Sequence, residues 1–327
     1  MGFETCGHEG TQVLEKVILS AAMITGTCRE RAQEALDVLC RQTIIDKMEI
    51  IVVDLGASMS KPFTYPPSVR VIVMPKSQET FWAAARMDAV KKASGDIIAF
   101  IEDHSFAHPD WAENVAKAFE GPWAAVGYSV VNANPQSYAS RAGLVSDYIL
   151  WMSPVLEGKA KLLPGNNVAY RRELLEHFGK RLEFDLGVDF NIHQALRKQG
   201  HSLAMSATAL IAHQNFERVG GLLRANYHYC RLLAANRASS QNWNVLRRIL
   251  YSAGAPIGAP VIKLIRIVKS LRGRSALVWP FISSIPVILL TFLVSAIGES
   301  LGYLFGAGRS AEDFNRWELM QPRIKNS

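Results

Sequence analysis

Cysteine is scarce in this chain of 327 residues, and the four that occur are scattered. Cys6, Cys28, Cys40 and Cys230 contain no C-x-x-C pair. That spacing argues against a metal-stapled module and against a disulfide framework, and it fits a reducing cytoplasm.

Targeting and nucleic-acid-binding signals are also lacking. Acidic and polar residues precede Val17, so the basic start and apolar run of a signal peptide are missing, and we expect the catalytic part to stay inside the cell. The net charge of +7 fits nucleic acid, anionic lipid or phosphorylated small molecules. Because the sequence has no zinc-finger, helix-turn-helix or RNA-binding aromatic motif, nucleic acid is the weakest of these.

The first half of the chain alternates apolar strands with helical patterns. The predicted strands are Lys16–Ala22, Glu49–Asp54, Val69–Met74 and Asp96–Ile101. A helical pattern through Ala32, Leu36 and Leu39 and a helix over Trp82–Ala93 separate them. Strands that alternate with helices predict βαβ units and a mostly parallel sheet, whose ligands lie at the carboxyl ends of the strands. A second region mixes shorter strands with helices, at Trp123–Val131, Arg171–Phe178, Asp189–Gln199 and Leu203–Ala212.

The composition changes after Asn242. Basic residues without intervening acids occur between Lys263 and Arg274, and no residue from Ala276 to Ile297 is charged. An uncharged run of roughly 20 residues meets the length needed to span hydrocarbon, although a buried helix of a soluble protein also meets it. The basic cluster favours the cytoplasmic side of a membrane. We expect membrane association, either spanning or lying in the interface.

Two carboxylate features follow apolar strands. Asp54 ends one strand, where it could bind a base or ribose, or cap a turn. Glu102, Asp103 and His104 follow the predicted strand Asp96–Ile101. They could bind ribose and a divalent cation that bridges phosphates, or form a solvated turn. Oxygen and imidazole ligands together suit Mn²⁺ or Mg²⁺, and Mn²⁺ tolerates nitrogen better.

The roles of two further residues, His213 and Asp189, depend on where the fold places their side chains. His213 follows an apolar strand and could complete a metal site if it lies close to His104. Asp189 heads a helical pattern, where it could cap the helix or act as a general base for an acceptor hydroxyl. Arg86 could bind a diphosphate, although an exposed base can also be merely solvated.

Taken in order, these pieces resemble family 2 glycosyltransferases of the GT-A fold over residues 14–237. The resemblance rests on five segments, which are E-I-I-V-V-D (Glu49–Asp54), A-A-R-M-D (Ala84–Asp88), the run from Ser94 to Trp111, L-P-G-N-N-V-A-Y-R-R-E-L-L (Leu163–Leu175) and V-D-F-N-I-H-Q-A-L-R-K-Q-G (Val188–Gly200). No single segment is specific, whereas five in this order are. The resemblance implies a Rossmann-like mixed α/β sheet, a nucleotide-sugar donor and a divalent cation.

The resemblance also implies roles for single residues. Asp54 would contact the nucleotide base and Arg86 the diphosphate. In the E-D-H triplet, Glu102 would bind ribose or metal, beside Asp103, and His104 would bind metal. Gly165 and Asn166 would line the donor-sugar pocket. Asp189 would be the base, and His213 would be the late metal ligand.

Several family patterns are altered in this chain. Ser20–Thr27 replaces the usual P-T-Y-N after the first strand, D-x-D becomes Glu102-Asp103-His104, and the acidic pair becomes Val188-Asp189. The Q-x-x-R-W of processive members is replaced by N-Y-H-Y-C-R at Asn226–Arg231, which predicts addition of a single sugar rather than polymerisation.

These observations predict an inverting, metal-assisted glycosyltransferase that moves one sugar to a glycan or lipid-linked acceptor. We expect an N-terminal tail, a GT-A catalytic domain, a membrane-associated helical region and a C-terminal tail, at residues 1–13, 14–240, 241–306 and 307–327. Two alternatives are a non-catalytic membrane scaffold that binds nucleotide sugar and a nucleotidyltransferase. The latter class would be expected to show a glycine-rich basic loop near the first strand, where Ser20–Thr27 has only Gly26.

Overall fold

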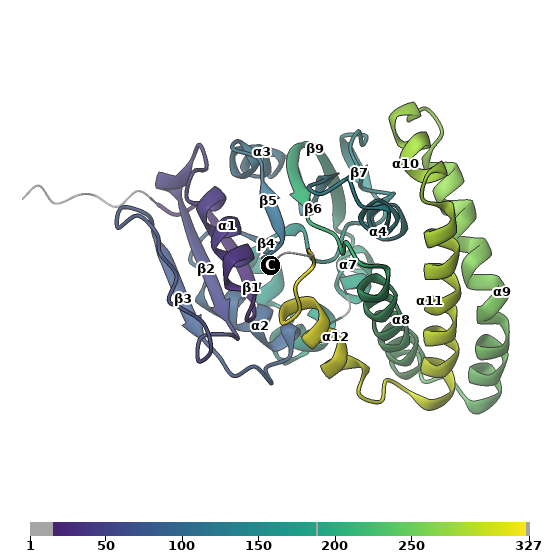
Figure 1. Cartoon of the computed structure of the whole chain (residues 1–327). Helices are drawn as coiled ribbons and strands as arrows, with labels where there is room; N and C mark the ends of the chain where they lie inside the picture. Colours follow the sequence, from purple (N-terminus) through teal and green to yellow (C-terminus); the bar gives the residue numbers. More distant parts are fainter. Residues whose placement is uncertain (1–15, 188, 325–327) are drawn as a thin grey trace, which may run out of the picture.

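The structure is a computed structural model that describes residues 16–187 and 189–324. Within these residues, nine strands form one sheet in the order β3-β2-β1-β4-β8-β6-β9-β5, with β7 paired to β9 (Figure 1). The strands are β1 (Leu19–Thr25), β2 (Met48–Asp54), β3 (Val71–Pro75), β4 (Ile97–Glu102), β5 (Ser105–Ala107), β6 (Trp123–Asn132), β7 (Gly158–Ala160), β8 (Val168–Arg171) and β9 (Ser202–His213).

The helices follow the same chain order. Those of the first 200 residues are α1 (Arg29–Leu39), α2 (Trp82–Lys92), α3 (Trp111–Ala118), α4 (Tyr138–Tyr148), α5 (Arg172–Glu176), α6 (Leu182–Leu186) and α7 (Asp189–Lys198). Those of the C-terminal part are α8 (Val219–Ser240), α9 (Val245–Ser270), α10 (Val278–Ile282), α11 (Ile285–Phe305) and α12 (Ser310–Leu319).

The sheet has a parallel half and a mixed half. Strands β3, β2, β1 and β4 run parallel to one another, as their alternation with α1 and α2 predicts. Strand β8 pairs antiparallel to both β4 and β6, and β9 then runs parallel to β6. Strands β4 and β9 therefore point in the same direction although two strands separate them. The predicted mixed α/β sheet is confirmed.

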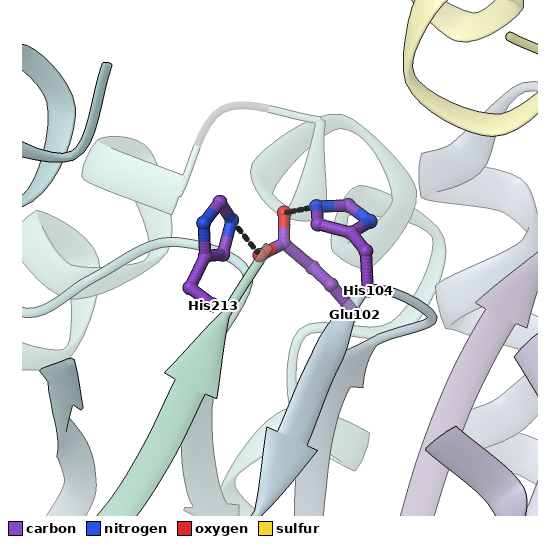
Figure 2. A group of neighbouring side chains, drawn as sticks. All are labelled: Glu102, His104 and His213. Carbon is purple, nitrogen blue, oxygen red and sulfur yellow. Dashed lines mark ion pairs between the residues drawn. The ribbon is translucent and has the colours of Figure 1, made fainter. Parts of the chain in front are cut away.

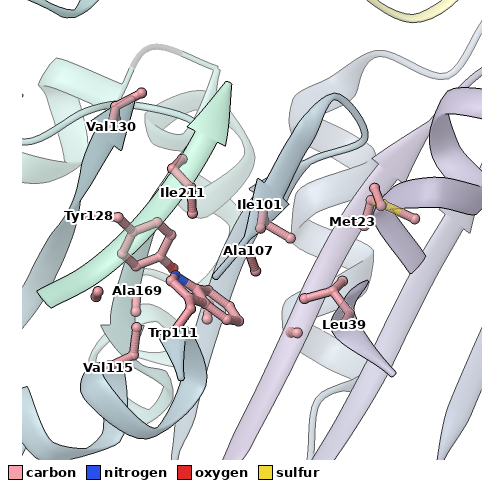
Figure 3. Packing of buried hydrophobic residues seen from close by; sticks show 14 of the residues in the cluster. Met23, Leu39, Ile101, Ala107, Trp111, Val115, Tyr128, Val130, Ala169 and Ile211 are labelled. Atoms are coloured by element: carbon pink, nitrogen blue, oxygen red, sulfur yellow. The ribbon is translucent and has the colours of Figure 1, made fainter. Parts of the chain in front are cut away.

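Apolar residues fill both faces of the sheet. On one face Met23, Ile101 and Ile211 pack with residues of α1 and α3, as Figure 3 shows. Trp111 and Tyr128 meet there edge to face, with ring centroids 5.2 Å apart, a geometry that aromatic pairs prefer. The opposite face is covered mainly by α2, α6 and α7. The parallel strands β1, β2 and β4 are buried on both faces, which explains their continuous apolar sequences, whereas the edge strand β3 is half-buried.

The uncharged C-terminal run does not form one helix. Residues 283 and 284 separate α10 from α11, and α11 begins at Ile285 with Pro286 in its first turn, where proline is well accommodated. Helix α11 then continues beyond the uncharged run to Phe305. It is the one described helix that is long and apolar enough to cross a membrane, with a mean hydropathy of 1.9.

Helix α11 packs against two other helices of the C-terminal part. It lies between α8 and α9 (Figure 1). A Cβ at Gly302 would lie 2.3 Å from the carbonyl oxygen of Arg231, so a glycine is required where α11 and α8 approach this closely. The last helix, α12, belongs to the segment that the sequence suggested was only a tail, and it packs back onto α8.

Candidate metal and donor site

The carboxyl ends of β1, β2, β4 and β9 lie at one edge of the sheet. After β4 the chain turns and forms β5, which pairs antiparallel to β9 with Ser105 opposite His213. The backbone N–H of Gln214 also donates to the carbonyl of His104, at 2.8 Å. This pairing places the Glu102-Asp103-His104 turn next to the end of β9, so residues more than 100 positions apart in the sequence lie close together there.

Glu102, His104 and His213 form a compact cluster (Figure 2). Nε2 of His213 lies 3.2 Å from one carboxylate oxygen of Glu102, and Nε2 of His104 lies 3.6 Å from the other. One potential ligand atom from each of the three residues lies within 4.8 Å of the other two. The side chains are covered, because Glu102 is 13% exposed and the two imidazoles are 2% and 4% exposed.

Neighbouring polar groups fix the orientation of both imidazole rings. Nδ1 of His104 lies 2.8 Å from an Asp103 carboxylate oxygen, and Nδ1 of His213 lies 2.9 Å from Oδ1 of Asn215. Both partners are acceptors, since the Asn215 amide nitrogen itself donates to Asn132 and to a carbonyl. A hydrogen on Nδ1 of each ring satisfies these acceptors, and in that tautomer a neutral ring turns the lone pair of Nε2 towards Glu102.

The Glu102 carboxylate is held from the other side by four donors. Tyr148 donates to it at 3.0 Å, Asn166 at 2.8 Å and Asn167 at 2.6 Å, with the Ser105 hydroxyl at 3.4 Å. Burial, followed by the adjacent Glu102 charge, holds the pKa of Tyr148 well above its ordinary value, so its hydroxyl remains a donor. The carboxylate has little freedom to rotate.

The cluster fits a divalent cation. Burial, followed by the nearby Arg323 guanidinium, lowers the pKa of His104 to about 3, so this ring is neutral at ordinary pH. Its Nε2 is buried and has no hydrogen-bond partner among the described residues. Two imidazole lone pairs and a carboxylate that face one another are a ligand set for a metal, and the mixed nitrogen and oxygen atoms suit Mn²⁺ better than Mg²⁺.

Asp103 faces away from this ligand set. It is fully buried and pairs with Arg31 of α1 at 3.0 Å as well as with His104. Arg31 is itself only 7% exposed, so the two charges are removed from water together. In this structure Asp103, predicted to bind the donor, orients His104 instead of facing a ligand.

Asp54 and Arg86, which were also predicted to bind the donor, form hydrogen bonds with other parts of the chain near the site. The Asp54 carboxylate accepts from Arg29 at 2.7 Å and from the backbone of Gly56 at 2.9 Å. Buried Arg86 donates to the carbonyls of Gly165 and Leu186. Arg86 therefore links the loop that carries Asn166 to the turn that precedes α7.

Asp189 is the first residue of α7, and its side chain lies outside the described part of the structure, as does Val188. The contact between Arg86 and Leu186 places the start of α7 next to the Gly165 loop. The N-terminal tail at residues 1–13 also lies outside the described residues.

Four contributing residues were not singled out from the sequence. They are Arg31, Tyr148, Asn167 and Asn215, which orient Glu102, Asp103 or the imidazoles. Asn167 carries a signal, since it adjoins Asn166 in the L-P-G-N-N segment. The other three lie on or next to elements without a recognisable motif, and only tertiary packing brings them to the site.

Comparison with known proteins agrees with this fold. Residues 20–179 match the family described as "Glycosyl transferase family 2". The match assigns residues 20–179, just under half of the chain, to this family. The chain is 34% identical over 87 residues to "Uncharacterized glycosyltransferase YwdF" of Bacillus subtilis (strain 168). That match covers 27% of this chain and spans about a third, 32%, of the relative's length.

Two solved structures resemble the whole fold. One is the mannosyltransferase PcManGT from Pyrobaculum calidifontis, in complex with GDP-Man and Mn²⁺, with a TM-score of 0.53, 17% identity and 87% of each chain covered. Residues 1–349 of S. aureus TarS give a TM-score of 0.46 at 13% identity, covering 84% of this chain and 90% of that one. The first likeness confirms the predicted GT-A fold.

Proposed function

We propose that this protein transfers a single sugar from a nucleotide-diphosphate sugar to a glycan or lipid-linked acceptor. The observation that carries the proposal is the convergence of Glu102, His104 and His213 at the edge where doubly wound sheets bind nucleotides. The match to glycosyltransferase family 2 and the GDP-Man and Mn²⁺ bound to the similar mannosyltransferase both support a nucleotide-sugar donor and a divalent cation.

In this proposal Glu102, His104 and His213 hold the cation. When bound, a divalent cation would offset the negative charge of the departing diphosphate. Asp103 and Asn215 keep the two imidazoles in the tautomer that leaves Nε2 free, and the donors around Glu102 fix its carboxylate. The residues thus provide a site whose geometry is set before the donor arrives.

Asp189 is proposed as the general base. The acceptor hydroxyl attacks the anomeric carbon as the bond from that carbon to the diphosphate oxygen breaks, and its proton passes to the Asp189 carboxylate. Attack from the face opposite the leaving group inverts the anomeric configuration, as the family resemblance implies. Arg86 supports this arrangement by joining the Gly165 loop to the turn before α7, and Asp54 shapes the loop next to β1.

The test is a transfer and donor-hydrolysis assay across a panel of UDP-sugars and GDP-sugars with Mn²⁺. We expect turnover with at least one donor, an inverted product, and a loss of about 10²-fold or more for Asp189→Asn. The matched control is Asp110→Asn, because Asp110 is exposed and remote from the acceptor side. Nucleotide binding without turnover on any donor would favour a non-catalytic scaffold, and full activity of Asp189→Asn would remove the role of that residue.

We also propose that α9 and α11 attach the protein to the cytoplasmic face of a membrane without crossing it. Leu246, Leu250 and Ile257 on α9 are 67–76% exposed, and further exposed apolar side chains lie on α10 and α11. Residues 245–274 include basic residues near both ends of the range and no acidic ones, which favours binding to anionic lipid. Because α11 packs along α8, an orientation in the interface fits better than a span.

Flotation with vesicles of anionic and of neutral lipid tests this attachment. We expect binding to anionic vesicles that falls by about tenfold or more when Leu250 and Ile257 are both changed to Glu. Met59→Glu is the matched control, because Met59 is 72% exposed and lies in the loop between β2 and β3. Equal binding by the double variant and the control would contradict the proposed surface.

A further inference from the structure

The metal-ligand cluster is covered by the C-terminal end of the chain. Residues 310–324, which we call the strap, comprise α12 and the five residues that follow it. In Figure 1 α12 and the yellow segment that follows it lie beside the central strands. With Glu102, His104 and His213 at most 13% exposed, a nucleotide diphosphate cannot reach this cluster unless covering groups move.

The strap is attached first to the loop after β1. A Cβ at Gly26 would lie 2.2 Å from the carbonyl oxygen of Leu319, and the Thr27 hydroxyl donates to the carbonyl of Met320. Arg31, the partner of Asp103, also donates to the carbonyl of Glu318 at 2.9 Å. These contacts place Glu318 next to the E-D-H turn.

A second attachment lies at the end of β9. The backbone N–H of Glu217 donates to the carbonyl of Arg323 at 2.8 Å, and the Arg323 guanidinium stacks on the Phe216 ring at 4.2 Å. Phe216 follows His213 by three residues. The strap therefore bridges from Arg31 to the end of β9, directly across the metal-ligand cluster.

Arg323 is a buried cation whose counter-ion comes from the strap itself. Its side chain is 5% exposed and pairs with the carboxylate of Glu318, and its Nε has no hydrogen-bond partner among the described residues. Arg323 acts electrostatically on the metal-ligand cluster, because its charge is among the causes that lower the pKa of His104 and of Glu102.

The other arginines near this edge are already engaged by groups of the catalytic part. Arg29 pairs with Asp54, Arg31 with Asp103, and Arg86 with two carbonyls. Among these arginines only Arg323 has its carboxylate partner, Glu318, on the strap, and Arg323 lies on the strap as well. Burial raises the pKa of Glu318, and the Arg323 guanidinium that pairs with its carboxylate opposes this rise.

We propose that Arg323 is a donor-binding residue that pairs with the diphosphate of the nucleotide sugar, and that Glu318 occupies the place of that diphosphate until the donor arrives. This inference rests on the proposed function. A phosphate offers oxygens that accept both arms of a guanidinium, so the exchange replaces one charged hydrogen-bonded pair by a stronger one. Arg323 is itself part of the strap, and its stack on Phe216 and the hydrogen bond from Glu217 to its carbonyl hold it at the end of β9 while α12 moves away with Glu318.

The test measures binding of UDP, GDP and their monophosphates to the full chain by calorimetry with Mn²⁺. For Arg323→Ala we expect diphosphate affinity to fall by about 10- to 100-fold, as for loss of a charged hydrogen bond, and monophosphate affinity to change much less. Arg323→Lys should retain part of the affinity, because it keeps the charge but not the fork. Glu318→Gln should bind diphosphates more tightly, because the competing anion is gone.

Arg316→Ala is the matched control, since Arg316 is an exposed cation on α12 of the same strap, and its affinities should equal those of the unchanged protein. Unchanged or tighter diphosphate binding by Arg323→Ala would overturn the inference and leave the strap as an obstruction. Equal losses for mono- and diphosphates would also overturn it. Failure of the unchanged protein to bind any of these nucleotides would instead refute the proposed function, and this inference with it.

Discussion

Arg31 offers a quantitative test of how the site is built. Its guanidinium pairs with Asp103 at 3.0 Å and donates to the carbonyl of Glu318, and both charged side chains are almost fully covered. The change Arg31→Met keeps the aliphatic part of the side chain but leaves Asp103 charged and buried without its cation. Breaking one partner of a buried ion pair costs about 3–5 kcal/mol. We therefore expect the free energy of unfolding to fall by about that amount.

Urea unfolding followed by tryptophan fluorescence measures this loss. The double change Arg31→Met with Asp103→Asn should recover about 2 kcal/mol, because it removes the uncompensated charge. Arg41→Met is the control, since Arg41 is exposed at the end of the same helix and should change stability by no more than about 0.5 kcal/mol. The reasoning would be refuted if Arg31→Met lost less than about 1 kcal/mol, or if the double variant were less stable than Arg31→Met.

Two further changes probe the strap and the support of Glu102. Gly26→Ala places a methyl group 2.2 Å from the Leu319 carbonyl, so trypsin should cleave the strap about 10- to 100-fold faster than in Gly254→Ala, whose added methyl meets no atom within 4 Å. Equal cleavage rates would show that the strap does not rest on Gly26. Tyr148→Phe removes a donor to Glu102 and should weaken Mn²⁺ binding by about tenfold, whereas the exposed Tyr138→Phe should not; equal affinities would contradict the assigned support.

The sequence predicted the parallel half of the fold because its signals are local. Buried strands such as β2 read as continuous apolar runs, and helices between them favour parallel pairing. Once the strands are parallel, Asp54 and Glu102 must lie at one edge. The approach of His213 was conditional, because it depends on the pairing of β5 with β9 and on two intervening strands, which no local pattern specifies.

Tertiary packing decided the features that the sequence did not foresee. The contact of Arg86 with the diphosphate stays a prediction, and the structure adds that this side chain donates to the carbonyls of Gly165 and Leu186, partners that no local pattern reveals. The uncharged run reads as one segment, yet it is broken before Ile285. Residues after 306 lack strong apolar periodicity, so the return of α12 to the site was not apparent. The roles proposed for Arg323 and Glu318 depend on this packing of α12 and the residues that follow it.

The most direct test of the central claim is a count of bound Mn²⁺ by electron paramagnetic resonance, with and without UDP or GDP. We predict one Mn²⁺ per chain for the unchanged protein, and a loss of affinity of about 10- to 100-fold or more for His213→Ala and for Glu102→Gln. His108→Ala is the matched control, because that exposed histidine pairs with Asp110 away from the cluster, and it should bind like the unchanged protein. Equal Mn²⁺ affinity and stoichiometry in His213→Ala and the unchanged protein would contradict the claim that Glu102, His104 and His213 form the metal site.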